Sequence, residues 1–183
     1  MNEEQIQMLD GKNKILLFRR MKDQGASAAK LIFQTEHTFE YERELDAIVT
    51  KDGTVVKVGE LETEVDIEAI AAKNDPVGSM LQSAMINGER LEIWEVNVDE
   101  DLADDGKYPA VYAQGYLSSW APTASAEDES EISSTFIVDL KPQFGFATLT
   151  AEQQEEVQYA FKDTVADDED ESNGDVEDEN TED

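Results

Sequence analysis

The sequence predicts a mainly β protein: a β-sandwich or partly open barrel with one flanking α-helix and a short C-terminal helix. Two observations support this class. Segments of alternating apolar and polar residues recur between turn residues, which is typical of strands. Helical periodicity is confined to two short segments, so strands do not alternate with helices as in a doubly wound sheet. The 183 residues suffice for one compact domain, which we expect over 14–165 after an N-terminal arm over 1–13.

The first part of this domain contains three short strands and one long excursion. Residues 15–20 form a compact apolar run, and residues 29–34 alternate. Residues 35–52 are highly charged with weak periodicity, so we predict a long loop that leaves the body of the domain. A short β-branched strand follows over 54–58, after a turn signal.

The clearest period in the chain runs over 60–69, where apolar residues and threonine alternate with carboxylates. Strict alternation predicts a strand with one buried face and one face in water. Neighbouring carboxylates on such a face stand about 7 Å apart and repel each other. The row is either a solvated strand face or an electronegative surface kept clear of contacts, and it comprises Glu60, Glu62, Glu64, Asp66 and Glu68.

A helix is predicted after the acidic row. Asp75 is a good N-cap, Pro76 suits the first helical position, and Asn87-Gly88 is a helix stop. One apolar stripe at helical spacing identifies the face that we expect to pack on the sheet: Val77, Met80, Leu81, Ala84 and Met85.

Four further strands are predicted over 91–98, 108–120, 132–140 and 144–149. The apolar parity shifts within 91–98, which indicates either a bulge or burial on both faces. A capping box at Thr150–Gln153 starts the C-terminal helix. The second of these strands carries an aromatic stripe that is either core or a protein contact: Tyr108, Tyr112, Tyr116 and Trp120.

The charge is strongly negative and unevenly placed. The formal charge of −30 excludes simple phosphate-driven nucleic-acid binding, which needs a basic surface. The last 17 residues hold 11 acids and no base, so we expect a disordered acidic tail over 166–183. The few basic residues concentrate early, either as a contact for an acidic partner such as a second copy or as ordinary strand-edge charges: Lys12, Lys14, Arg19 and Arg20.

Little in the sequence indicates catalysis. The absence of cysteine excludes disulfides, thiolate zinc sites and a cysteine nucleophile, and a single histidine, His37, cannot build a common zinc site. We expect His37 to be exposed or at an interface. Carboxylate pairs are too abundant to identify a hydrolase site, and no calcium-loop spacing fits. We therefore expect no catalytic residue, cofactor or metal, and the lack of a long apolar run or signal sequence predicts no membrane association.

Seven segments, in order, resemble the major tail proteins, or tail tube proteins, of phages with long non-contractile tails that infect Gram-positive bacteria. They are GKNKILLFRR, AAKLIFQTEHTFEYERE, TKDGTVVKVGELETEV, IAAKNDPVGSMLQSAMINGERLEIWEV, YPAVYAQGYLSSW, TASAEDESEISSTFIV and ATLTAEQQEEVQYAFKDT. The resemblance runs from Gly11 to Thr164, and its specificity lies in the ordered set, since no segment is a catalytic signature.

The resemblance implies a structural virion protein, not an enzyme, that forms stacked hexameric rings and so a hollow tube for genome ejection. It implies a β-sandwich with a flanking helix and a long inter-subunit loop between early strands. With the terminal segments, that loop bridges subunits and rings. Here the loop is about 34–52, with candidate contacts Gln34, Glu36, His37, Phe39, Tyr41, Arg43, Asp46 and Lys51.

The implied partners are further copies of the chain, a tape-measure protein, a distal tail (tail tip) protein and a tail terminator. Double-stranded DNA passes without specific binding, and the implied location is the virion tail, with the host cytoplasm during assembly. The carboxylate row is our candidate for the lumen, because it repels phosphates. The residues leave two alternatives: an acidic β-sandwich binding module, as a DNA mimic or carbohydrate binder, and a carboxylate-based enzyme.

Overall fold

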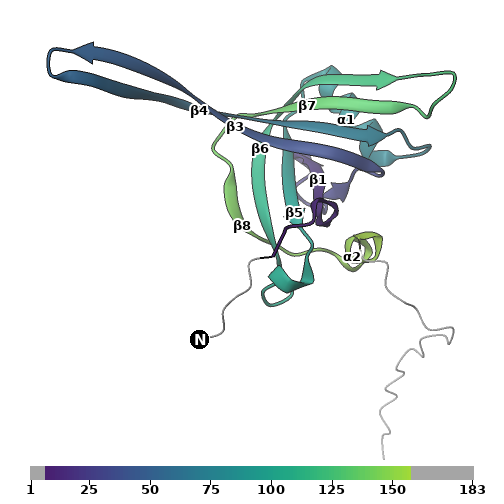
Figure 1. The fold of residues 1–183 in the computed structure, drawn as a ribbon. Coiled ribbons are helices and arrows are strands. Elements are labelled where there is room, and N and C mark those ends of the chain that lie inside the picture. The colour runs from purple at the N-terminus through teal and green to yellow at the C-terminus, as the bar shows by residue number, and fades with distance from the viewer. Residues whose placement is uncertain (1–6, 158–183) are drawn as a thin grey trace, which may run out of the picture.

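The computed structural model describes residues 7–157 and shows one mainly antiparallel sheet with two helices (Figure 1). The sheet has eight strands in the order β2-β1-β5-β6-β7-β4-β3, with β8 added to β6. Short 3-10 turns lie at 11–13, 21–23 and 100–102. The elements are β1 (Lys14–Arg20), β2 (Ala29–Lys30), β3 (Gln34–Thr50), β4 (Gly53–Ile70), α1 (Pro76–Asn87), β5 (Leu91–Asn97), β6 (Tyr108–Thr123), β7 (Glu131–Val138), β8 (Gln143–Ala147) and α2 (Ala151–Val157).

Strand β6 belongs to both halves of the sheet. Its first part pairs with β5 and β8, and its second part pairs with β7, which leads to β4 and β3. The two halves face each other, because one buried cluster holds Leu16 and Phe18 of β1 together with Val65 of β4 and Phe136 of β7. The sheet is thus a sandwich that is open at its edges, as predicted.

Gly115 lies where β6 changes partners, opposite Leu91 of β5 and Val138 of β7. A Cβ atom at this position would stand 1.9 Å from the carbonyl oxygen of Ile137. Glycine is therefore required by the close approach of the β7 backbone.

One side chain partly closes the gap between β1 and β3. The Leu16 amide donates to Oε1 of Gln34 at 2.9 Å, and Nε2 of Gln34 donates to the Leu16 carbonyl at 2.7 Å. Gln34 thereby supplies the hydrogen bonds that a paired strand would have given β1.

Helix α1 begins and ends as its sequence predicts. Oδ1 of Asp75 accepts a hydrogen bond from the Val77 amide at 2.9 Å, and Gly88 adopts a left-handed φ of 63° at the C-cap. The predicted stripe faces the core: Val77, Leu81 and Ala84 are buried, with the partly buried Met80 and Met85 packed against them.

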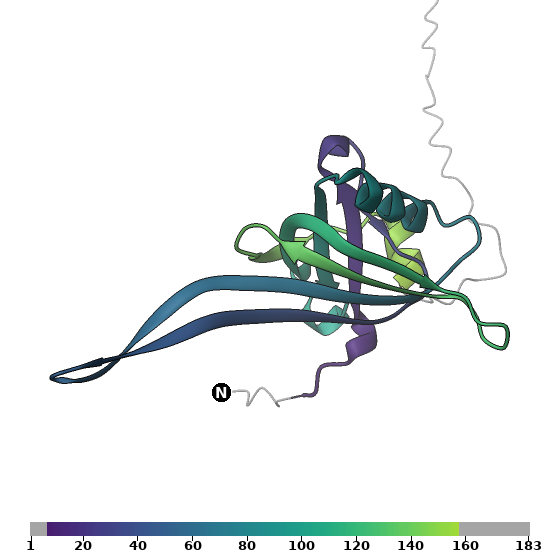
Figure 2. The same ribbon diagram turned by 90° about the horizontal axis from the view of Figure 1, so that it is seen from above.

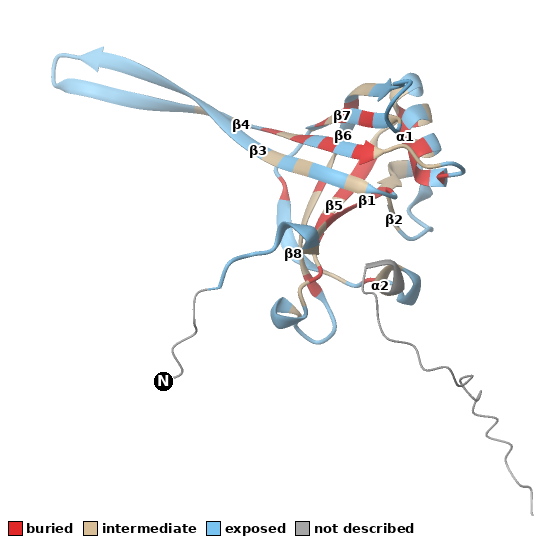
Figure 3. Ribbon diagram, turned by 45° about the vertical axis from the view of Figure 1, so that its right-hand side comes forward, coloured by how far each residue is buried: buried red, intermediate tan, exposed pale blue. Residues whose placement is uncertain are grey.

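Strand β5 is buried on both faces and has no register shift, which decides between the two predicted alternatives. Most of β5 is coloured as buried in Figure 3. Its outer face belongs to a second cluster that includes Leu149 after β8, namely Ile15, Leu17, Val96, Val98, Tyr108 and Leu149. The predicted aromatic stripe on β6 is interrupted, because a bulge between Leu117 and Ser119 turns Trp120 toward the first cluster, while Tyr116 stays 43% exposed.

Three predictions about the early strands were wrong. The strand expected over 29–34 is only β2, since the backbone turns at Phe33, which has a φ of 54°. The loop expected over 35–52 is strand β3, and the segments 54–58 and 60–69 are one strand, β4. High charge hid the pairing of β3 with β4 along a single long hairpin.

The outer part of this hairpin leaves the body of the domain (Figures 1 and 2). Every residue from 40 to 58 is exposed. The predicted excursion is therefore present, as a two-stranded ribbon.

Helix α2 starts with the predicted capping box. The Gln153 amide donates to Oγ1 of Thr150 at 3.2 Å, and the Thr150 amide donates to Oε1 of Gln153 at 2.8 Å. The acidic tail expected over 166–183 and the first six residues of the expected arm lie outside the described residues. Within the described part of the chain, no helix is long and apolar enough to cross a membrane.

Candidate functional site

The acidic row occupies the outer face of β4. Thr63, Val65, Ile67 and Ala69 are buried, and the intervening carboxylates point to solvent, with only Glu64 partly buried. The alternation of carboxylates with apolar residues and threonine in the sequence is thus the alternation of exposed and buried side chains along β4.

Strand β3 doubles the row. Glu36 lies opposite Glu68, Glu40 opposite Glu64, and Glu42 opposite Glu62. Like charges directly opposite on a sheet destabilise it, so this arrangement is costly in the isolated chain. The sequence analysis missed Glu40 and Glu42. Their signal was available, because acidic and threonine residues occupy every second position from 36 to 44.

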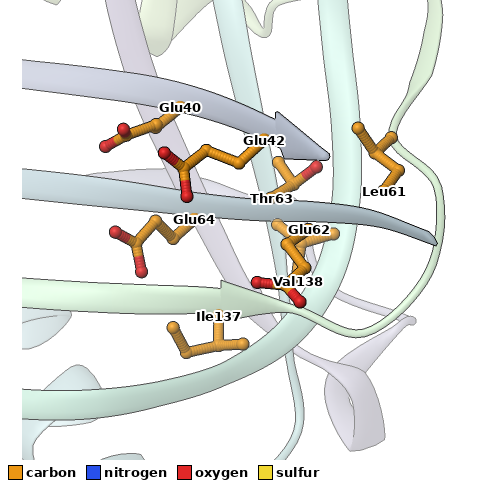
Figure 4. Close-up of a pocket in the computed structure, with 8 residues that line it drawn as sticks. All are labelled: Glu40, Glu42, Leu61, Glu62, Thr63, Glu64, Ile137 and Val138. Carbon is orange, nitrogen blue, oxygen red and sulfur yellow. The ribbon is translucent and has the colours of Figure 1, made fainter. Parts of the chain in front are cut away.

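Four of these carboxylates border a shallow pocket of about 250 Å³ (Figure 4), formed by Glu40, Glu42, Leu61, Glu62, Thr63, Glu64, Ile137 and Val138. Carboxylate oxygens of Glu40, Glu64 and Asp66 lie within 4.8 Å of one another, and such oxygens are the ligands that hard cations prefer. Among the described residues, no ion pair involves a carboxylate of this face. The face is a continuous negative surface, which we call the acidic face: Glu36, Glu40, Glu42, Glu60, Glu62, Glu64, Asp66 and Glu68.

The hairpin beyond the acidic face is apolar on one side. Its register pairs Leu45 with Val58, Ala47 with Val56, and Val49 with Thr54, so these six residues share a face, which we call the hairpin stripe. Val49 is 83% exposed and Leu45 63% exposed. The opposite face carries the charged pair Asp46 and Lys57 and one exposed apolar pair, Ile48 and Val55. An apolar surface of this kind in water indicates a contact with another molecule.

A bulge separates the acidic face from the hairpin stripe. The register of β3 advances from Arg43 to Leu45 while that of β4 moves from Leu61 to Val58, leaving Gly59 and Glu60 opposite Glu44. The extra residue on β4 keeps Leu45 and Val58 on the core side of the ribbon. The hairpin stripe therefore continues the core face of β3 and β4 beyond the body of the domain.

The root of the hairpin is fixed by a buried carboxylate. Oε2 of Glu95 lies 2.9 Å from Nε2 of His37, and its Oε1 accepts from Nζ of Lys14 at 2.8 Å. Burial opposes ionisation of Glu95, but the hydrogen bonds from His37 and Lys14 hold its pKa below the ordinary value. Tyr41 is 44% exposed, and the partial desolvation of its hydroxyl, together with the charge of Glu95, raises the pKa of that phenol. Sequence reasoning missed Glu95, which carries no signal apart from the parity shift of β5.

The predicted inter-subunit residues divide into two groups. Gln34 and His37 are engaged within their own chain. The His37 side chain is only 10% exposed, which does not fit the exposed alternative, and its place at an interface stays a prediction. Phe39 packs against the core and stacks on Tyr41 at 5.8 Å. The remaining candidates lie toward or on the projecting part: Glu36 on the acidic face, Arg43 bonded to the Gly59 carbonyl, and the exposed Asp46 and Lys51.

The early basic residues also have partners within the chain. The ion pairs are Lys12 with Asp10, Lys14 with Glu95, Arg19 with Glu92, and Arg20 with Glu89. The hydrogen bond to the buried Glu92 raises the pKa of Arg19. These side chains pair with carboxylates of their own chain, and a contact with an acidic partner stays a prediction.

The chain combines an open β-sandwich, a continuous acidic face and an apolar ribbon that extends beyond the body of the domain. These exposed surfaces are typical of a subunit of a larger assembly. A family model described as phage tail tube protein matches residues 8–144, and the chain belongs to this family. It is 27% identical over 163 residues to a candidate tail protein of Staphylococcus phage phiMR25, covering 86% of this chain and 84% of that protein.

Solved structures share the fold. The tail tube of SPP1, determined by solid-state NMR and cryo-EM, matches with a TM-score of 0.72 at 21% identity, covering 89% of this chain and 92% of the SPP1 chain. A chain from the virion of a native gene transfer agent particle matches with a TM-score of 0.58 at 11% identity, covering 75% of this chain and 99% of that chain.

Proposed function

We propose that this chain is the structural subunit of a phage tail tube, which polymerises as stacked hexameric rings into an electronegative conduit for genome ejection. The acidic face is the observation that carries this proposal. It extends along two strands, has no ion-pair partner among the described residues, and costs stability in the monomer. A surface that is unfavourable in the monomer is explained if its charge serves the assembled state.

We assign the acidic face to the lumen. A channel for DNA must not bind DNA, and fixed carboxylates repel the phosphates of a passing duplex. Repetition of the face in each of six copies turns a local surface into a ring of negative charge. Because charges in water are screened beyond about 8 Å at physiological salt, the repulsion acts close to the wall and leaves the centre of the channel nearly field-free.

The projecting hairpin supplies the contact between copies. A ribbon that contacts a different surface of the next copy makes a heterologous interface, which grows into rings or open-ended stacks. The net charge of −30 keeps unassembled copies apart by mutual repulsion until assembly begins. The tape-measure protein, the distal tail protein and the tail terminator are the further partners that this role requires. The same role places the chain in the host cytoplasm during assembly and then in the virion tail.

Negative-stain electron microscopy of the purified full chain, concentrated at moderate salt, tests this function. We expect hollow tubes whose end views show six-fold rings. If only monomers persist, including in the presence of tail-tip proteins, the assembly role is contradicted. That outcome favours the alternative of an acidic binding module, which is then tested by titration with a basic protein.

A further inference from the structure

The two layers of the sandwich are offset. Pairing in register places Leu16, Glu95, Val111 and Phe144 in one row across β1, β5, β6 and β8. Leu16 lies in the main core, and His37 of the opposite layer reaches this row at Glu95. Beyond Glu95 the row continues uncovered, and Phe144 is 76% exposed. The core face of this layer thus extends past the cover that β3 and β4 provide.

The uncovered part is a groove of about 450 Å³ with a mainly apolar wall. Pro109 pairs with Phe146 and Val111 with Phe144, so these four side chains share the face that looks into it. The two charged groups at its border, Lys14 and Glu95, are paired with each other. We call this surface the β8 groove: Leu9, Lys14, Glu95, Asn97, Pro109, Ala110, Val111, Phe144, Gly145 and Phe146.

The layer that contains β3 and β4 also extends beyond the other layer, at the end where the hairpin projects. The core face of β3 and β4 runs from Phe39 and Val65 through the bulge into the hairpin stripe, where no layer formed by residues 7–157 covers it. In both views the tip of the hairpin lies clear of the rest of the chain (Figures 1 and 2), so it does not fill the β8 groove of its own copy. The described part of the chain therefore has an uncovered apolar ribbon and an uncovered apolar groove, both continuous with its core.

We propose that the hairpin stripe of one copy packs into the β8 groove of a second copy and completes its sandwich. This inference rests on the proposed self-assembly and names the two surfaces that carry it. The hairpin stripe has no charged residue, so packing it onto the paired Lys14 and Glu95 leaves no new unpaired charge.

The absence of cysteine from the chain makes a clean cross-linking test possible. Two variants, Val56→Cys and Phe146→Cys, are mixed, concentrated under tube-forming conditions and treated with a bis-maleimide. A spacer of about 10 Å suits the packing distance of two sheets. Both sites are more than half exposed, so the variants should fold normally. We expect a mixed dimer of the two variants to form at least several-fold above the control.

The matched control pairs Val56→Cys with Ile86→Cys, since Ile86 is 75% exposed on α1, away from the β8 groove. Tubes in the microscope with no mixed dimer above this control would overturn the inference and leave the proposed function standing. Absence of tubes, rings and mixed dimer in the wild type and variants would reject both.

A second measurement identifies what covers the groove. We expect a fluorescent maleimide to label Phe146→Cys rapidly in dilute monomer and at least tenfold more slowly in tubes. Slow labelling already in the monomer would show that another segment of the same chain fills the groove, which would overturn the proposal. Equal labelling of monomers and tubes would overturn it as well.

Discussion

The carboxylate of Glu95 lies 2.9 Å from the imidazole of His37 and joins the centre of one sheet layer to the root of the projecting hairpin in the other. Lys14 holds the second oxygen of the same carboxylate. One buried charge therefore ties β1, β3 and β5 together at the border of the β8 groove. Removing one partner from such a group leaves the others unpaired, which costs more than the pair itself contributes.

Replacement of this carboxylate should have a pH-dependent effect. The folded-state pKa of Glu95 is lowered, so the stability it contributes is present above its ordinary pKa of 4.5 and is lost as the pH falls through the folded value. We expect Glu95→Gln to lower the free energy of unfolding by about 1–3 kcal/mol at pH 7. Urea titrations from pH 7 to pH 3 should show the difference shrinking with acidity. A constant difference would mean that Glu95 acts by packing alone, and Glu127→Gln in an exposed loop is the control.

Neutralising one member of an opposed pair on the acidic face should stabilise the monomer. Glu40 faces Glu64, so we expect Glu40→Gln to raise the free energy of unfolding by about 0.2–1 kcal/mol at low salt. Thermal melts in low and high salt check the cause, because screening should remove most of the gain. A gain that is independent of salt would point to packing instead of charge.

Reversing charge on the same face should change how the assembled tube treats DNA. We expect Glu62→Lys combined with Glu64→Lys to give tubes that retain a short DNA duplex, whereas wild-type tubes exclude it, since basic groups attract phosphates. Co-sedimentation of labelled duplex with tubes measures this. Equal exclusion by variant and wild-type tubes would place the acidic face away from the lumen.

Shortening the hairpin should separate folding from assembly. Residues 45–58 are all exposed, so replacing them with an Asn-Gly turn should leave the thermal midpoint within a few degrees of the wild type. Tubes should not form, because the hairpin stripe is gone. Circular dichroism and electron microscopy of the same sample check both expectations. Normal tubes from this variant would contradict a bridging role for the hairpin.

A methyl group at Gly115 should strain the junction of β6. Its Cβ atom would lie 1.9 Å from the carbonyl oxygen of Ile137, so the backbones must separate. We expect Gly115→Ala to cost about 1–3 kcal/mol of unfolding free energy, measured by denaturant titration. Gly145→Ala is the matched control on β8, where no atom lies within 4 Å of the added carbon. Equal stabilities of the two variants would contradict the close packing at Gly115.

The sequence predicted those features that depend on neighbouring residues. The cap at Asp75 and the alternation of β4 are set by local chemistry, and both are as expected. Features set by pairing at a distance were missed. The alternation of His37, Phe39 and Tyr41 with polar residues is present in the sequence, but the partner of this strand is set by the distant pairing of β3 with β4.

Bulges limited the prediction of faces for a similar reason. A single extra residue changes the side on which every later residue lies, and nothing near Ser118 in the sequence marks the shift that turns Trp120 inward. The family resemblance implies that the excursion contacts other subunits, which stays a prediction, and the side chain of Gln34 at its start is bonded to Leu16 of its own chain. The apolar part beyond Glu44 remains as the segment available to another copy.

The opposed carboxylates of the acidic face have a consequence for transport. Fixed like charges at this density hold a layer of mobile cations, just as the phosphates of DNA do. On the proposed assignment of the acidic face to the lumen, a passing duplex would meet a surface with the same kind of ion layer that it carries itself. The two layers exchange cations and form no lasting contact. Such a wall would let a stiff polyanion slide past with little friction.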